Sequence, residues 1–488
     1  MHSTRWAWVA LGVLLAGPGA SSLVAAQDEA DGWVPLFDGK TLDGWRAGEN
    51  RETFSVRDGA IVAHGPRCHL FYVGPVAKGD FKNFELTAEV MTRAGANSGI
   101  YFHSEYCQGG WPRKGLEVQI NNSYRGHGNY RELKRTGSLY GRRNVFPQVV
   151  KDDEWFTMHL AVRGRRVTVG VNGMKLVDYV EPDEVPRGRR LGHGTFALQG
   201  HDPGSEVRFR KILVRPLPDG EKPADTRSAD EIALQGRISK LFAASLPLID
   251  FHVHIKGGLT MDQALAHSVQ TGIGYGLAAN SGLDFAIKDD RALLAYYKSL
   301  EGKPVFKGMQ AEGREWVKMF SKEAIAKFDY VFTDAMTFTD LRGKRIHLWR
   351  ANEVQIGDEQ KFMDHYVDVT VGILTDEPID ILANATILPG ALRAKYDALW
   401  TPARMDRVIQ AARKNGVAIE INANSRVPSI AFVKRAKQAG CTFSFGTNNQ
   451  NPRLGHLAYC LDVAEACKLR KADMFMPGWR SRTPPEAK

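Results

Sequence analysis

The chain has 488 residues, of which 43% are hydrophobic and 25% are charged, and its formal net charge is +10. At roughly 100 to 200 residues per domain, this length predicts two or three domains, and the composition excludes extended disorder. The basic residues are dispersed in short runs such as "RGRRVTV" and "EVPRGRRLGH". Such runs favour solvated turns, so we expect no nucleic-acid partner.

Residues 1–26 read as a secretory signal peptide. A single arginine precedes an apolar run from Trp6 to Ala16, and small residues follow up to Val24 and Ala26, which suit signal peptidase. An uncleaved membrane anchor is the alternative, but the apolar run is shorter than the roughly 20 residues that a span requires. We therefore expect a secreted or periplasmic protein with no membrane span.

The first predicted domain covers residues 33–217. Asp58-Gly59 and Asn172-Gly173 are hairpin signals between short runs with β alternation, as in "TFSVRDGAIVAHG". Many such runs follow one another with almost no helical periodicity. This pattern predicts an all-β sandwich or jelly roll.

A stretch rich in proline and charge predicts a linker over residues 218–230. The second predicted domain covers residues 231–475, where short apolar runs alternate with helix-length segments, as in repeated β/α units. Seven strands are expected, near residues 247–255, 274–280, 304–312, 328–334, 379–384, 417–422 and 442–448. Helices are expected at residues 231–244, 291–300, 402–414 and 429–439. The fold class is therefore multidomain, an all-β sandwich followed by a distorted α/β barrel of seven units.

Polar residues share a face of the predicted strands in the first domain. Because residues two apart in a strand point the same way, Tyr101, His103 and Glu105 are expected on one face, and Glu117 with Gln119 on one face. Aromatic planes beside carboxylate and amide groups are what a sugar site requires.

The segments "NSGIYFHSEY", "GLEVQINN", "TGSLYG", "FALQGH" and "VRFRKILV", opened by "WVPLFDGKTLDGW", resemble the 3-keto-disaccharide hydrolase domain family over Trp33 to Val214. The resemblance implies a concanavalin-like jelly roll that cleaves glycosides already oxidised at the sugar C3 by a separate sugar 3-dehydrogenase. A C3 ketone acidifies the C2 hydrogen, so base-assisted elimination followed by hydration replaces hydrolysis by paired carboxylates.

Under this resemblance we expect the base to be His103 or Glu117. The expected substrate-binding residues are Asn97, Tyr101, Glu105, Gln119, Tyr140 and His201. A structural histidine and a buried acid paired with an arginine are the alternatives for the two candidate bases. The alternative for the whole chain is a carbohydrate-binding jelly roll attached to a metal-dependent hydrolase.

In the second domain His252 and His254 lie two apart at a predicted strand end, a common way to offer a metal two imidazoles. With seven β/α units, residues 248–469 resemble the polymerase and histidinol phosphatase (PHP) barrels, and Glu312 matches that family's glutamate. The family's other ligand positions fall on Asn280, Met336, Asn384, Asn448 and Gln450.

Neutral amides hold transition metals weakly, so we expect this PHP-like barrel to have lost phosphoesterase chemistry. Two alternatives stay open for His252, His254 and Glu312: they hold one divalent metal ion, or they are hydrogen-bonded remnants. The amide rim suits a polyhydroxylated ligand and comprises Asn280, Asn384, Asn422, Asn424, Asn448 and Gln450.

Overall fold

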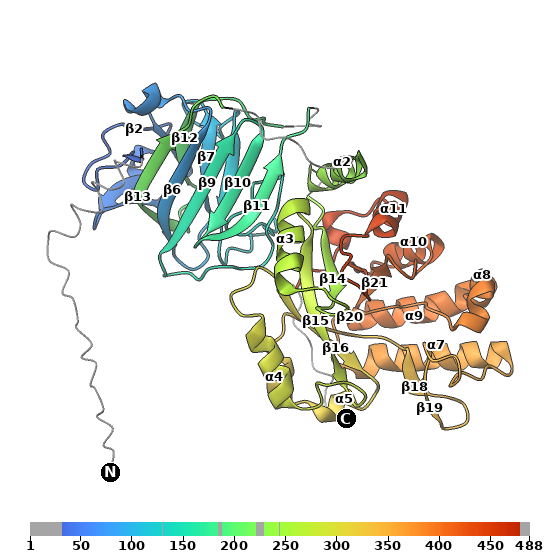
Figure 1. Cartoon of the computed structure of the whole chain (residues 1–488). Helices are drawn as coiled ribbons and strands as arrows, with labels where there is room; N and C mark the ends of the chain where they lie inside the picture. The colour runs from blue at the N-terminus through green and yellow to red at the C-terminus, as the bar shows by residue number, and fades with distance from the viewer. Residues whose placement is uncertain (1–31, 129, 184–187, 221–228, 244, 479–488) are drawn as a thin grey trace, which may run out of the picture.

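The structure is a computed structural model that describes residues 32–128, 130–183, 188–220, 229–243 and 245–478. A β-sandwich comes first and an α/β barrel follows it, as Figure 1 shows. The predicted signal peptide and residues 221–228 of the predicted linker lie outside the described residues. Within those ranges, no helix combines the length and the apolar character needed to cross a bilayer.

The sandwich has two antiparallel sheets, which confirms the predicted jelly roll. One sheet has the order β11-β10-β9-β6-β13-β4-β3, with β1 paired to β13, and the other has the order β2-β5-β12-β7-β8. The strands are β1 (Val34–Pro35), β2 (Trp45–Ala47), β3 (Phe54–Arg57), β4 (Ala60–His64), β5 (Cys68–Tyr72), β6 (Phe84–Thr92), β7 (Ser98–Ser104), β8 (Leu116–Ile120), β9 (Phe156–Arg163), β10 (Arg166–Val171), β11 (Met174–Val180), β12 (Thr195–Gly200) and β13 (Glu206–Pro216).

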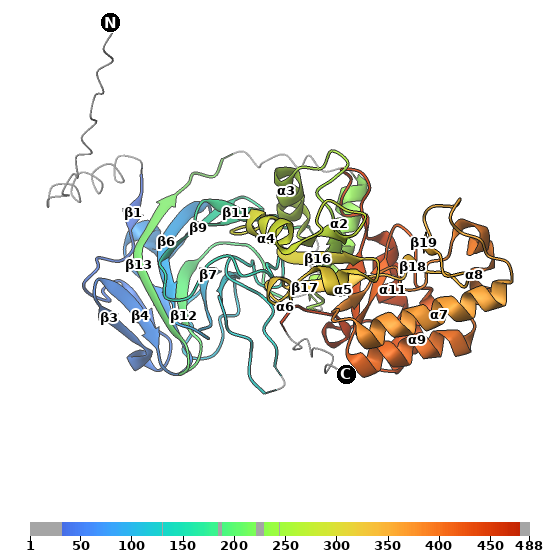
Figure 2. The ribbon, with the colours of Figure 1, turned by 90° about the horizontal axis from the view of Figure 1, so that it is seen from below.

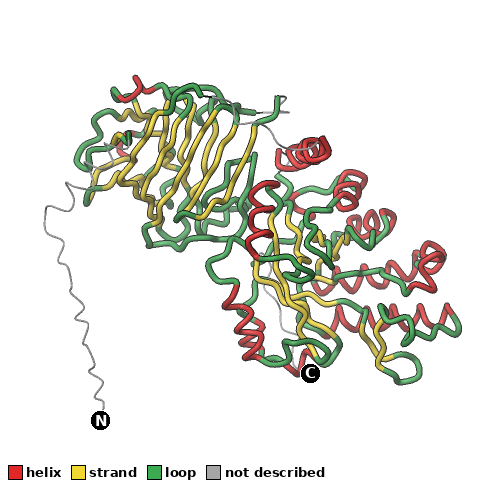
Figure 3. Tube along the Cα trace, in the orientation of Figure 1, coloured by secondary structure: helices red, strands yellow, loops and turns green. Residues whose placement is uncertain are grey.

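Alternating residues explain why these segments pair as strands. On β6 the side chains of Phe84, Leu86, Ala88 and Val90 are buried and pack in the sandwich core. Thr87, Glu89 and Met91, on the opposite face of the strand, are partly exposed. This alternation is the pattern of a strand with one face on a core. The tube in Figure 3 shows that this domain is built almost entirely of strands and loops.

The second domain is a closed parallel barrel in which all seven predicted strands are present. Its order is β14-β15-β16-β17-β20-β21-β22. The strands are β14 (Ile249–Val253), β15 (Gly274–Gly282), β16 (Phe306–Glu312), β17 (Tyr330–Thr333), β20 (Ile381–Leu382), β21 (Ala418–Asn422) and β22 (Phe443–Gly446), with a hairpin of β18 (Thr337–Thr339) and β19 (Arg345–His347).

Helices cover the outside of the barrel. The four predicted ones correspond to α2 (Ala229–Ala243), α4 (Asp290–Ser299), α9 (Pro402–Asn415) and α10 (Ile430–Gln438). The structure adds α3 (Met261–Thr271), α5 (Trp316–Met319), α6 (Lys322–Ile325), α7 (Glu359–Asp376), α8 (Tyr396–Leu399) and α11 (Ala458–Ala466). Several begin at a side-chain cap that accepts a backbone N–H, namely Thr260, Asp289, Asp358, Thr401 and Ser429.

Candidate active site

A cavity of about 450 Å³ opens on the sheet formed by β2, β5, β12, β7 and β8. Its volume falls in the range of small-molecule sites. Six of the predicted site residues line it: Asn97, Tyr101, Glu117, Gln119, Tyr140 and His201. The other lining residues are Trp111, Pro112, Tyr124, His127, Tyr130, Glu132, Arg189 and Gln199.

Strand register brings the central residues of this cavity together. Tyr101 on β7 lies directly opposite Glu117 on β8, and Gly99 lies opposite Gln119. The Gln119 amide donates to Asn97 Oδ1 at 2.5 Å. The predicted sharing of a face by Glu117 and Gln119 is therefore confirmed.

Glu117 is one of two buried carboxylates that line the cavity, and the other is Glu132. Its side chain accepts from Gln199 Nε2 at 3.3 Å and lies 3.4 Å from an Arg189 guanidinium nitrogen. Burial raises the pKa of Glu117 above its ordinary value, and the Arg189 charge opposes that rise. A carboxylate with a raised pKa, held in a polar cavity, has the properties of a general base.

Gly99 leaves the space that the Glu117 side chain occupies. A Cβ at this position would lie 2.6 Å from Glu117 Oε1 and 3.0 Å from its Cγ. We expect Gly99→Ala to lower kcat/KM by about 10- to 100-fold, because a displacement of about 1 Å is enough for such a loss. Gly170→Ala on β10 of the other sheet, whose Cβ would meet nothing closer than 3.4 Å, is the control. Equal activity of the two variants would contradict the expected position of Glu117.

The expectation that Tyr101, His103 and Glu105 share a face is wrong. His103 has a φ of +54°, and the pairing of β7 with β12 shifts register nearby, so the alternation breaks after Tyr101. His103 and Glu105 line a different cavity, of about 720 Å³. Glu105 is exposed there and pairs with Lys114 at 2.5 Å.

His103 is a structural histidine by its contacts. One ring nitrogen donates to the Lys82 carbonyl at 2.9 Å, and the other accepts from the Gly192 N–H at 3.1 Å. Burial lowers the pKa of His103 to about 4, so the ring is neutral. Glu117 is therefore the one predicted base that lies in the cavity with the other candidate residues.

Sequence reasoning missed the residues that connecting loops bring to the cavity. Arg189 belongs to the run "EVPRGRRLGH", which was predicted to be a solvated turn, yet its guanidinium lies 4.9 Å from the Tyr101 ring centroid. Glu132 comes from the long connection between β8 and β9. It pairs with Lys134 at 3.1 Å and accepts from Tyr140 Oη at 3.4 Å. In a single sequence, nothing distinguishes a loop charge that reaches a cavity from one that is exposed to solvent.

A histidine and a carboxylate form a pair at the rim of the cavity. His201 Nδ1 lies 2.5 Å from Asp202 Oδ2, and the His201 ring packs against Trp111 and Tyr124. A carboxylate on one ring nitrogen orients the imidazole and leaves the other nitrogen for proton transfer. The sequence singled out His201 but not Asp202.

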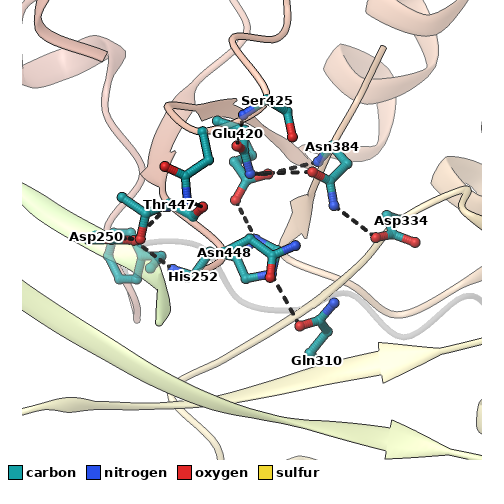
Figure 4. Close-up of polar contacts among 12 residues, drawn as sticks. Asp250, His252, Gln310, Asp334, Asn384, Glu420, Ser425, Thr447 and Asn448 are labelled. Carbon is teal, nitrogen blue, oxygen red and sulfur yellow. Dashed lines mark hydrogen bonds and ion pairs between the residues drawn. The ribbon is translucent and has the colours of Figure 1, made fainter. Parts of the chain in front are cut away.

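The carboxyl ends of the barrel strands carry a second polar network, shown in Figure 4. His252 Nδ1 lies 2.6 Å from Glu420 Oε1, and His252 Nε2 lies 3.1 Å from Gln310 Oε1. Burial alone would raise the pKa of Glu420, but the adjoining His252 lowers it below its ordinary value. Asp250 lies next to this pair and accepts from Thr447 Oγ1 at 2.6 Å. The sequence did not single out Glu420, because it lies inside an apolar strand.

Two buried polar atoms of this network have no hydrogen-bond partner among the described residues. They are His254 Nε2 and Glu312 Oε2. His254 Nδ1 lies 2.9 Å from the Ala278 carbonyl, and Glu312 Oε1 accepts from Asn280 at 2.6 Å. Burial, with a contribution from Asp334, raises the pKa of Glu312 to about 8.

Most amides of the predicted rim donate hydrogen bonds to other residues of the barrel. Asn384 donates to Asp334 Oδ2 at 3.0 Å, Asn422 donates to Glu420 Oε2 at 3.2 Å, and Asn424 donates to the Thr447 carbonyl at 2.5 Å. Gln450 is exposed and donates to Asn448.

A metal ion held by His252, His254 and Glu312 would need a donor atom from each of the three side chains. His254 and Glu312 each offer one unpaired atom, but both nitrogens of His252 face Glu420 and Gln310. Within the described ranges, no three His, Cys, Asp or Glu side chains converge to hold a metal. Because both nitrogens of His252 already have protein partners, these three side chains do not present a ready set of metal ligands.

Comparison with known proteins supports the assignment of the first domain. Residues 32–215 match the model of the 3-keto-alpha-glucoside-1,2-lyase-like domain. A 3-keto-disaccharide hydrolase of Bacteroides thetaiotaomicron is 37% identical over 240 residues, covering 39% of this chain and 80% of that protein. A solved structure from Parabacteroides distasonis is 23% identical, covers 39% of this chain and 97% of its own, and has a TM-score of 0.35. A Bacillus subtilis protein with a galectin-like fold is 13% identical, covers 38% and 94%, and has a TM-score of 0.29.

Proposed function

Because the chain belongs to the 3-keto-disaccharide hydrolase family and is a hydrolase, we propose that its jelly-roll cavity cleaves glycosides whose sugar C3 is a ketone. The observation that carries this proposal is the buried Glu117 carboxylate, set among the amides of Gln119 and Gln199 and the Tyr101 ring. Such a set supplies one base and several donors and acceptors for sugar hydroxyls.

The proposed reaction is an elimination followed by hydration. Glu117 removes the C2 proton, and the electron pair forms the enolate of the C3 ketone, which donors such as the Gln199 amide stabilise. The enolate re-forms the ketone as the C1–O bond breaks, and the leaving oxygen receives a proton from His201, which Asp202 orients. Water then adds at C1 and gives one proton to His201, while Glu117 returns its proton to C2, so both side chains regain their starting states. The sum is hydrolysis of the glycosidic bond.

This role predicts how kcat/KM depends on pH. A base is active when deprotonated, so kcat/KM should fall as the pH drops through the raised pKa of Glu117. Arg189 lowers that pKa, so Arg189→Met should raise the pKa and move the acid limb to higher pH. The measurement is the pH profile of leaving-group release from a 3-keto-glucoside. Arg166→Met, which removes an exposed partner of Asp178 on β10, is the control. An acid limb at the same pH in Arg189→Met and wild type would argue against Glu117 as the base.

We propose that the barrel is an accessory domain of PHP-like descent without phosphoesterase activity. Support comes from the closed seven-stranded barrel and from the amides that occupy its carboxyl end, where Asn384 and Asn422 bond to Asp334 and Glu420. One observation favours the alternative of a binding jelly roll attached to a catalytic PHP barrel, namely the unpaired His254 Nε2 and Glu312 Oε2. Hydrolysis of p-nitrophenyl phosphate that depends on added Mn²⁺ or Zn²⁺ would favour the alternative.

The substrate of this reaction requires an upstream oxidation. A glycoside carries a C3 hydroxyl, so a separate sugar 3-dehydrogenase must first produce the ketone. We propose that the protein is exported, as its N-terminal residues indicate, and meets the oxidised glycoside in the periplasm or outside the cell.

A further inference from the structure

The described part of the connection between β8 and β9, residues 121–128 and 130–155, lies between the sandwich and the barrel, as Figure 2 shows. It contributes five lining residues to the sandwich cavity: Tyr124, His127, Tyr130, Glu132 and Tyr140. The wall of the proposed active site therefore belongs to a segment that also faces the second domain.

Alternate residues of this connection face the two domains. Glu132 lines the cavity and pairs with Lys134, which lies 4.1 Å from the Tyr140 ring centroid. Leu133, between them, is buried in an apolar cluster made largely of barrel residues. Phe146, further along, joins the same cluster.

That cluster is the amino-terminal mouth of the barrel. It contains the first residue of each of five strands, namely Ile249, Phe306, Tyr330, Ile381 and Ala418. The polar network with Glu420 lies at the opposite end, because Glu312 and Asn422 are the last residues of β16 and β21. Leu133 and Phe146 thus close the amino-terminal end of the barrel. In barrel enzymes this end usually contributes to stability, whereas the opposite end carries the active site.

Polar contacts from the barrel hold the same connection. Arg125 donates to the Gly478 carbonyl at 2.8 Å, and Lys471 donates to the Arg131 carbonyl. The Lys471 ammonium also lies 5.5 Å from the ring centroid of Tyr130. Buried Arg143 donates to Gln235 on α2. Contacts on both sides of Glu132 therefore come from the second domain.

We propose that the barrel acts as the support that positions the cavity wall, with Leu133 and Lys471 as positioning residues for Glu132, Tyr130 and Tyr140. This inference rests on the proposed function of the cavity. It gives the fusion of the two domains a physical reason, since the sandwich alone lacks the surface against which Leu133 and Phe146 pack.

The test uses the full chain and the variant Leu133→Ala. We expect kcat/KM for a 3-keto-glucoside to fall at least about tenfold, because the cavity wall loses its support. Amide hydrogen exchange in residues 130–146 should become faster. Leu133→Met should restore both values, since methionine fills a similar volume. Lys471→Met should show the same two changes as Leu133→Ala.

A matched control separates support of the wall from general loss of stability. Leu374→Ala removes an equally buried leucine from α7, in the part of the barrel core that does not include Leu133. It should leave kcat/KM and exchange in residues 130–146 unchanged. Wild-type kcat/KM in Leu133→Ala, with or without faster exchange, would overturn the inference. If the wild-type chain itself cleaves no 3-keto-glycoside, the proposed function fails, and hydrogen exchange alone decides whether the barrel holds this segment.

Discussion

Replacing Glu117 by glutamine is expected to lower kcat/KM for a 3-keto-glucoside by about 10²- to 10⁴-fold, the usual contribution of a general base. Glutamine has nearly the same shape and keeps an oxygen for Gln199, but it cannot take the C2 proton. The measurement is the initial rate of leaving-group release by the full chain at several substrate concentrations. KM should change much less than kcat, because the sugar-binding groups remain.

Glu105→Gln is the control for Glu117→Gln. Both carboxylates belong to the same short region of the sequence, but Glu105 is exposed, pairs with Lys114 and lines the other cavity. We therefore expect Glu105→Gln to keep kcat/KM within about twofold of wild type. A large loss in Glu105→Gln with little loss in Glu117→Gln would show that the wrong cavity has been assigned.

Replacing Glu420 by alanine is expected to destabilise the barrel by about 3–5 kcal/mol, because a buried, hydrogen-bonded carboxylate–histidine pair loses one member. Glu420 and His252 are each about 2% exposed. Glu420 also accepts the Asn384 backbone N–H at 2.7 Å and the Asn422 side chain at 3.2 Å. The substitution thus leaves several buried donors without an acceptor. The free energy of unfolding of the barrel, from denaturant titration of the full chain, is the quantity to measure.

Glu359→Ala provides the control for this stability effect. Glu359 pairs with Lys395 at 2.6 Å, the same distance as in the buried pair, but both side chains are substantially exposed. Exposed pairs contribute about 0–1 kcal/mol, so this variant should unfold almost as wild type does. A loss in Glu420→Ala as small as that in Glu359→Ala would mean that the carboxyl end of the barrel is open to water.

Much of the fold could be predicted because apolar periodicity encodes it directly. All seven barrel strands were visible as apolar runs, and α9 begins where Thr401 caps and Pro402 opens the helix. The position of Glu117 and Gln119 on one face of β8 also followed from alternation. Alternation failed at His103, because a left-handed backbone conformation there turns the next residues toward another cavity.

The remaining site residues depend on tertiary contacts that alternation does not report. Arg189 reaches Glu117 from a loop, and Glu132 reaches the cavity because Leu133 beside it packs into the barrel. Glu420 is one charge in the apolar run "VAIEIN", and only barrel closure brings it to His252. The place of each of these residues in the site is set by contacts with residues that are distant in the sequence.

The most direct test compares leaving-group release by the full chain from a 3-keto-glucoside and from the same glucoside with its C3 hydroxyl unoxidised. The account predicts rapid release from the ketone and none above background from the parent, because only the ketone acidifies the C2 hydrogen that Glu117 removes. Equal release from both substrates would contradict it, since cleavage would then need no enolate.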